Sequence, residues 1–185
     1  MTSIDPKEAA SALSDVEDIV RRVRQSTIYN LSSLIMIMWG VLVFAGYLAS
    51  YLSPRSAGYG WLAVYVAGIA GSVALSAFNR ARTGVRTFDY RMLAAFLLLI
   101  AFGAFCSGVL NHLTPRQLGT FWPIYFMLVY SIVGLWFGYA FVAIGLSITA
   151  LTLVGYFYVG GAFDLWMAFV NGGGLVVGGL WMRRS

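Results

Sequence analysis

Residues 31–51 read LSSLIMIMWGVLVFAGYLASY, a stretch without a single charged residue. A hydrocarbon core of about 30 Å is crossed by roughly 20 residues of helix, so this stretch has the length and composition of a transmembrane helix. The chain on either side is similar, because 60% of its residues are hydrophobic and only 10% are charged. Soluble domains carry about 25% charged residues. The composition therefore predicts an integral membrane protein and excludes a soluble or disordered one.

Charged and turn-forming residues divide the chain into six apolar segments. From Gln117 to Met182 it contains one charged residue, Asp164, and this length accommodates three helices. We predict an all-α membrane domain over residues 31–182, with helices at residues 31–51, 59–79, 92–112, 120–136, 139–158 and 163–181. The boundary at Phe137-Gly138-Tyr139 carries no charge or proline, so a merged or kinked helix with five crossings in total is the alternative.

The distribution of basic residues predicts the orientation of these helices, because loops rich in Lys and Arg stay in the cytoplasm. Six crossings place only Arg55 and Arg116 on one side. The other side then carries ten basic residues: Lys7, Arg21, Arg22, Arg24, Arg80, Arg82, Arg86, Arg91, Arg183 and Arg184. Five crossings would separate the last two from the rest. We therefore expect both termini in the cytoplasm, with residues 183–185 as a short cytosolic end.

Two of the connections resemble each other. Leu52-Ser53-Pro54-Arg55 matches Leu113-Thr114-Pro115-Arg116, and Trp61 matches Trp122, each pair being 61 residues apart. The pattern predicts three helical hairpins, at least two of which arose by duplication as a parallel repeat. The alternative is that short turns simply favour Pro, Gly and Trp. Because Trp prefers the headgroup region, Trp61, Trp122 and Trp166 are interpreted as interfacial anchors.

Residues 1–30 are polar and are predicted to form a cytosolic amphipathic helix. Its apolar side chains are three or four residues apart, which places them on one face of a helix. We call this face the partner seam; it consists of Leu13, Val16, Val20 and Val23. Basic residues lie only in the last turn, whereas a helix lying on lipid carries them throughout its polar face. The seam is therefore expected to bind protein: a cytosolic partner, a second copy in a homo-oligomer, or the chain's own loops. A solvated connector is the alternative.

A basic loop precedes the third predicted helix. Each basic residue beside an anionic leaflet contributes about 1 kcal/mol of lipid attraction. The candidate anionic-lipid contacts are Arg80, Arg82, Arg86 and Arg91. No Gly-rich phosphate loop accompanies them, and the remaining basic residues fit the topology, so neither a nucleotide nor a nucleic acid is expected as a partner.

The sixth predicted helix contains Asn171-Gly172-Gly173-Gly174, followed by Gly178. Gly174 and Gly178 form a GxxxG pair, which lets another helix approach closely. Asp164, Asn171 and Gly178 share one helical face, and polar groups on a membrane helix turn inward because their exposure to lipid is costly. Two hypotheses follow: tight helix packing, or a ligand or ion site centred on Asn171.

Enzyme chemistry finds little support in the residue inventory. Cys106 and His112 are the single Cys and the single His, and they do not share a helical face. His112 and Asp164 both fall near the outer interface, but nothing in the sequence brings them together. We expect no catalytic, cofactor or metal site.

The predicted function is that of a membrane-embedded interaction or regulatory subunit that uses its N-terminal helix. The alternative is a small transporter or channel component with a site on the sixth helix. The preference for Arg over Lys points to a bacterial inner membrane.

Overall fold

The computed structural model describes residues 30–83, 90–109 and 113–184, and all regular structure in these residues is helical. Five helices are long and apolar enough to cross a membrane, and the apolar helix Ala94–Val109 is shorter. The protein is therefore an all-helical, multi-pass membrane protein. Residues 1–29, which contain the partner seam, and also Arg86 and His112 lie outside the described residues.

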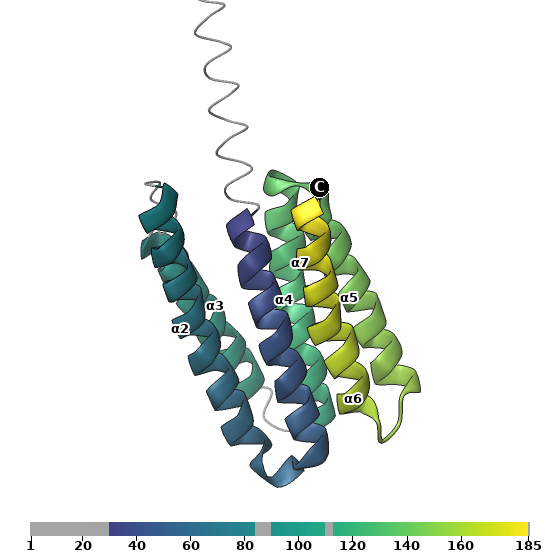
Figure 1. Cartoon of the computed structure of the whole chain (residues 1–185). Helices are drawn as coiled ribbons and strands as arrows, with labels where there is room; N and C mark the ends of the chain where they lie inside the picture. The colour runs from purple at the N-terminus through teal and green to yellow at the C-terminus, as the bar shows by residue number, and fades with distance from the viewer. Residues whose placement is uncertain (1–29, 84–89, 110–112, 185) are drawn as a thin grey trace, which may run out of the picture.

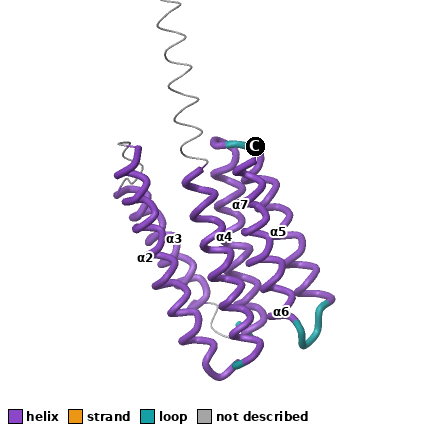
Figure 2. The backbone as a smooth tube through the Cα atoms, viewed as in Figure 1, coloured by secondary structure: helices purple, strands orange, loops and turns teal. Residues whose placement is uncertain are grey.

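The helices follow one another with short connections (Figures 1 and 2). The first helix is Asn30–Leu52. It is followed by the 3-10 turn η1 Pro54–Ser56, α2 Ala57–Thr83, α3 Tyr90–Val109, α4 Pro115–Phe137 and α5 Tyr139–Tyr158. The last segment has three parts, which are α6 Phe163–Met167, the π-helical segment η2 Ala168–Gly173 and α7 Gly174–Arg184.

The boundary between α4 and α5 is a single residue, Gly138. Its φ of 140° and ψ of 151° lie in a region that is essentially restricted to glycine. Its N–H donates to the carbonyl of Gly134, and its own carbonyl accepts from Phe141 N at 3.2 Å. The chain therefore forms two helices here rather than one merged helix, and glycine is required for the reversal.

The start of α4 differs from the prediction, because the helix begins at Pro115 rather than at residue 120. Thr114 and Gln117 form a capping box in which the Thr114 N–H donates to Gln117 Oε1 at 2.8 Å. Such a box satisfies backbone donors that a helix start leaves unpaired. The Thr-x-x-Gln pattern was visible in the sequence and extends the helix by more than one turn.

Four helical segments make the core of the bundle: the first helix, α4, α5 and α6–α7. Their buried apolar side chains form two clusters, and the larger one includes Met36, Met127, Ile144, Ile148 and Leu175. Among the labelled helices the most extensive packing joins α4 to α5. The helices α2 and α3 lie outside this core, α2 beside the first helix and α3 beside α4.

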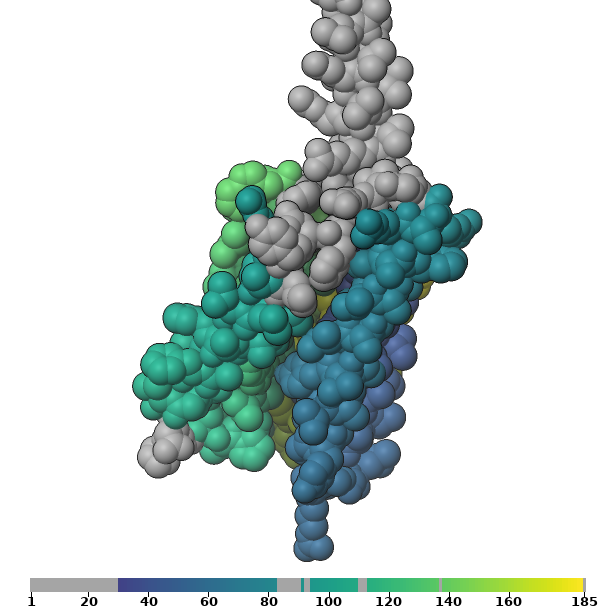
Figure 3. Space-filling view, turned by 90° about the vertical axis from the view of Figure 1, so that its left-hand side faces the viewer, coloured from purple at the N-terminus to yellow at the C-terminus, as the bar shows by residue number. Residues whose placement is uncertain are grey.

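The two outer helices are separated from each other. Figure 3 shows a cleft between α2 and α3, in which atoms of the yellow C-terminal helix are visible. At one end of the bundle, Figure 1 places the C-terminus, the start of the first helix, the end of α2 and the start of α3. This end carries exposed arginines, and we call it the arginine-rich end: Arg80, Arg82, Arg91, Arg183 and Arg184. Arg55 and Arg116 lie at the opposite end.

Candidate functional site

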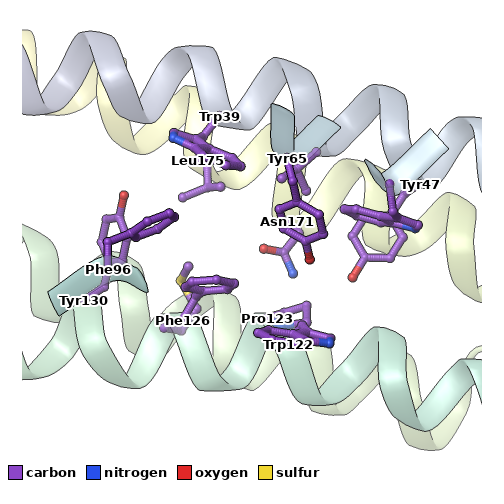
Figure 4. A pocket seen from close by; sticks show the side chains of 13 residues that line it. Trp39, Tyr47, Tyr65, Phe96, Trp122, Pro123, Phe126, Tyr130, Asn171 and Leu175 are labelled. Carbon is purple, nitrogen blue, oxygen red and sulfur yellow. The ribbon is translucent and has the colours of Figure 1, made fainter. Parts of the chain in front are cut away.

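A cavity of about 130 Å³ lies between the core helices and the two outer helices. Thirteen side chains line it, from the first helix, α2, α3, α4, η2 and α7 (Figure 4). Eight of them are aromatic: Trp39, Tyr47, Trp61, Tyr65, Phe96, Trp122, Phe126 and Tyr130. The others are Val43, Pro123, Met127, Asn171 and Leu175. We call this space the aromatic cavity.

Most of the aromatic side chains reach the cavity because they lie four or eight residues apart along their helices. Residues four apart lie on one face of a helix, one turn above the other. The stripes consist of Trp39, Val43 and Tyr47 on the first helix, Trp61 and Tyr65 on α2, and Trp122, Phe126 and Tyr130 on α4. Three such stripes facing one another produce an aromatic lining on several sides.

Hydrogen bonds hold two of the indole rings against neighbouring helices. Trp39 Nε1 donates to Ser72 Oγ of α2 at 3.1 Å, and Trp61 Nε1 donates to Ser50 Oγ of the first helix at 3.1 Å. Buried Trp N–H groups normally find such partners, which leaves the ring as an apolar surface. These donors are therefore engaged by the protein itself and are not free to bind a ligand.

Asn171 differs from these residues. It is 3% exposed, and its amide nitrogen Nδ2 has no hydrogen-bond partner among the described residues. Figure 4 shows the amide directed into the cavity, toward the side of Trp122. Leaving a buried amide unpaired costs about 1–3 kcal/mol by mutational measurements. An unpaired donor that faces a cavity can bind an acceptor on a ligand.

The backbone around Asn171 is also unusual. Residues Ala168–Gly173 form a π-helical segment, and the N–H of Gly174 after it donates to the carbonyls of Phe169, Val170 and Asn171. Single π-turns inside α-helices occur frequently at functional sites. The glycine run therefore widens the helix at the cavity without breaking it, and Phe163–Arg184 remains one membrane span.

The glycines of η2 and α7 pack against two different neighbours, α5 and the first helix. A Cβ atom on Gly174 or Gly178 would lie 3.1 Å or 2.9 Å from the nearest atoms of Ile148 and Ile144 on α5. The close backbone approach is made by other glycines. A Cβ on Gly172 would lie 2.6 Å from Phe44 N, and one on Gly179 would lie 2.9 Å from the Ser33 carbonyl oxygen. Gly174 and Gly178 thus face the α5 side chains, while Asn171 faces the cavity.

Asp164 does not line the cavity. It lies half-buried in the first turn of α6, where a negative charge is favourable beside the helix N-terminus. The N-cap residue is Ala162, and no side chain makes a cap hydrogen bond there. Among the predicted candidates on the sixth helix, Asn171 is therefore the residue that the structure places in a cavity.

The candidate lipid contacts in the described residues lie at the surface. Arg80 and Arg82 are exposed in the last turn of α2, and Arg91 is exposed near the start of α3. The Arg82 guanidinium lies 5.8 Å from the centre of the Phe78 ring. These positions fit contact with headgroups at the arginine-rich end.

The tryptophans of the predicted repeat have a different environment from the one expected. Trp61 and Trp122, which we expect from the sequence to be interfacial anchors, both line the aromatic cavity. The same 61-residue offset also relates Tyr65 to Phe126, and these two line it as well. The spacing of four within each stripe was the signal in the sequence that indicated a shared inward face.

Over the described ranges, no three His, Cys, Asp or Glu side chains are grouped so that they could hold a metal ion. No known protein family, curated protein or solved structure matches the chain.

Proposed function

We propose that this protein is a non-enzymatic membrane protein that binds a small apolar molecule in the aromatic cavity, as the binding component of uptake or sensing. The observation that carries the proposal is the unpaired amide of Asn171, which is directed into a cavity lined by eight aromatic side chains. Binding sites for small molecules are typically apolar concavities with a few well-placed polar groups. This cavity has that composition.

The volume limits the size of the bound group. An engineered apolar cavity of about 150 Å³ in another protein binds one benzene molecule. The aromatic cavity, at about 130 Å³, therefore accommodates one ring-sized group. Pockets that bind drug-sized ligands measure roughly 300–1,000 Å³. A single ring, stacked against Trp or Phe side chains, is the best fit.

Quenching of tryptophan fluorescence by bromobenzene tests this proposal. Val43→Phe fills part of the cavity, and Val177→Phe adds the same ring on α7, where Val177 is 67% exposed. We expect saturable quenching in the wild type and in Val177→Phe, and its loss in Val43→Phe. Equal quenching in all three would mean that the probe reports from lipid-facing tryptophans, and the proposal would be wrong.

The proposal also includes the orientation of the protein in the membrane and its cellular location. The arginine-rich end would face the cytoplasm, with both termini on that side and with Arg80, Arg82, Arg86 and Arg91 near anionic headgroups. The positive-inside rule supports this orientation. The preference for Arg over Lys supports a bacterial inner membrane, and the 61-residue offset supports an origin of the hairpins by duplication.

A regulatory role of the N-terminal segment remains a second proposal, supported by the pattern of the partner seam. A double change of Leu13→Asp and Val20→Asp charges the seam without touching the membrane domain. We expect this variant to insert normally and to lose a protein that copurifies with the wild type in mild detergent. Identical copurification by both proteins would eliminate the seam as a recognition surface.

A further inference from the structure

The unpaired donor at Asn171 restricts the chemistry of the ligand. An amide nitrogen donates hydrogen bonds, so the bound group needs an acceptor oxygen at that point. The hydrogens on Nδ2 carry partial positive charge, which disfavours a cation there even though aromatic rings attract cations. None of the side chains lining the cavity is ionisable at neutral pH, so nothing would balance a charged ligand. The ligand is therefore neutral and carries a carbonyl or similar acceptor.

The packing of the outer helices indicates how such a ligand reaches the cavity. α2 is held to the first helix by the Trp39–Ser72 hydrogen bond, and α3 is held to α4 by Tyr125, whose hydroxyl donates to the Leu99 carbonyl at 3.2 Å. Between α2 and α3 lies the cleft seen in Figure 3. Two half-buried residues that line the cavity, Tyr65 and Phe96, come from these two helices. The cavity therefore opens sideways, toward lipid.

The exposed faces of α2 and α3 are suited to hydrocarbon. On α3 the side chains of Leu98 and Phe102 are 70% and 61% exposed, and on α2 those of Leu62 and Val66 are 62% and 61% exposed. In a bilayer these side chains contact acyl chains. A tail that leaves the cavity between α2 and α3 would therefore remain in an apolar environment.

We infer that the ligand is a membrane lipid whose head is a single planar ring bearing a carbonyl, the chemistry of an isoprenoid quinone head. The ring lies in the aromatic cavity with its carbonyl at Asn171 Nδ2, and the tail lies in the cleft between α2 and α3. This inference rests on the proposed function and adds the acceptor and the route of the tail. The cavity of about 130 Å³ is too small to enclose both parts.

Three probes test the inference by calorimetric titration of the full chain in lipid nanodiscs. para-Decylacetophenone has the ring, the acceptor and the tail. Decylbenzene lacks the acceptor, and acetophenone lacks the tail. One hydrogen bond to a buried donor is worth up to about tenfold in affinity. We expect the wild type to bind para-decylacetophenone about tenfold more tightly than decylbenzene. Asn171→Leu should bind both equally, and Asn79→Leu, which removes an amide outside the cavity, should behave like the wild type.

Each of the remaining outcomes shows which part of the inference is wrong. Equal affinity of the wild type for the two tailed probes would overturn the acceptor assignment and leave the proposed function intact. Binding of acetophenone together with exclusion of para-decylacetophenone would overturn the route between α2 and α3. Absence of binding of all three probes would contradict the proposed function itself. A difference between the tailed probes that persists in Asn171→Leu would assign the acceptor to another residue.

Discussion

The hydroxyl of Tyr47 donates a hydrogen bond of 2.7 Å to the carbonyl oxygen of Gly119, across 72 residues of sequence. This carbonyl has lost its usual helical partner, because the residue four positions later is Pro123, which has no N–H. Membrane helices tolerate proline where a neighbouring helix satisfies the freed backbone group. Tyr47 and Pro123 both line the aromatic cavity. One hydrogen bond therefore satisfies the unpaired carbonyl of α4 and also holds the first helix against α4.

Tyr47→Phe should therefore destabilise the protein by about 1–2 kcal/mol, the upper part of the range for interhelical hydrogen bonds in membranes. The Pro123→Ala variant supplies an N–H for Gly119, so Tyr47→Phe should cost clearly less in that background. Reversible unfolding in mixed micelles measures all four proteins of this double-mutant cycle. Tyr51→Phe is the control, because Tyr51 is 42% exposed on the same helix. An equal cost in both backgrounds would show that Pro123 is not the reason for the bond.

Arg116 binds the C-terminal end of α5. Its guanidinium donates to the carbonyls of Gly155 at 3.1 Å and Tyr156 at 2.5 Å, and also to that of Val159. It also lies 5.0 Å from the centre of the Phe163 ring. A cation near the C-terminus of a helix satisfies unpaired carbonyls and opposes the helix dipole. This arginine therefore joins three helices.

Arg116→Ala should lower the stability by about 1–3 kcal/mol, because it removes several charge-assisted hydrogen bonds. Arg116→Lys should recover only part of this, since an ammonium group lacks the planar fork of donors. The matched control is Arg55→Ala at the equivalent position of the repeat, where Arg55 is exposed; its effect should stay within about 0.5 kcal/mol. Thermal melting in detergent compares the three variants. Equal losses at both arginines would refute the capping role.

Two adjacent glycines in η2, Gly172 and Gly173, provide a test variant and its matched control. A Cβ on Gly172 would meet the backbone of Phe44, whereas a Cβ on Gly173 would have no atom within 4 Å. Gly172→Ala should cost about 1–3 kcal/mol through overpacking. Gly173→Ala should be neutral or slightly stabilising, because Ala favours helix over Gly. The same melting experiment measures both, and a damaging Gly173→Ala would mean that the π-helical backbone itself requires glycine there.

The orientation can be read from the labelling of introduced cysteines in a Cys106→Ser background. Ser53→Cys lies at the end opposite to the arginine-rich end and should react with an impermeant reagent in intact cells. Thr83→Cys, at the end of α2, should react only after the membrane is opened. The opposite pattern would reverse the assigned orientation.

Much of the fold could be predicted from the sequence because membrane helices are recognisable by their length and hydrophobicity. The six apolar segments match the helices to within a few residues, and Gly138 is the break expected at the weakest boundary. The start of α4 was missed because the capping box at Thr114 lies outside the apolar run. Hydropathy locates the apolar part of a helix but carries no information on its capping residues.

The candidate site was predicted only in part. Asn171 stood out as the polar residue in a glycine-rich helix, and it lies in the cavity. The aromatic lining was missed, since tryptophans near helix ends are usually interfacial and the sequence does not say which helices are neighbours. Trp61 and Trp122 line the same cavity only because α2 and α4 both border it. The role of Arg116 was missed for the same reason, because its partners on α5 lie about 40 residues away in sequence.

The position of a bound ring tests the central claim most directly. Crystals grown with para-bromoacetophenone allow the bromine to be located by its anomalous scattering. We expect one dominant bromine site inside the aromatic cavity, with the ring near Trp122 and its carbonyl oxygen within hydrogen-bond distance of Asn171 Nδ2. In crystals of Asn171→Leu this site should weaken or disappear. Bromine found only on the lipid-facing surfaces of α2 and α3, with the cavity empty at a saturating concentration, would contradict the account.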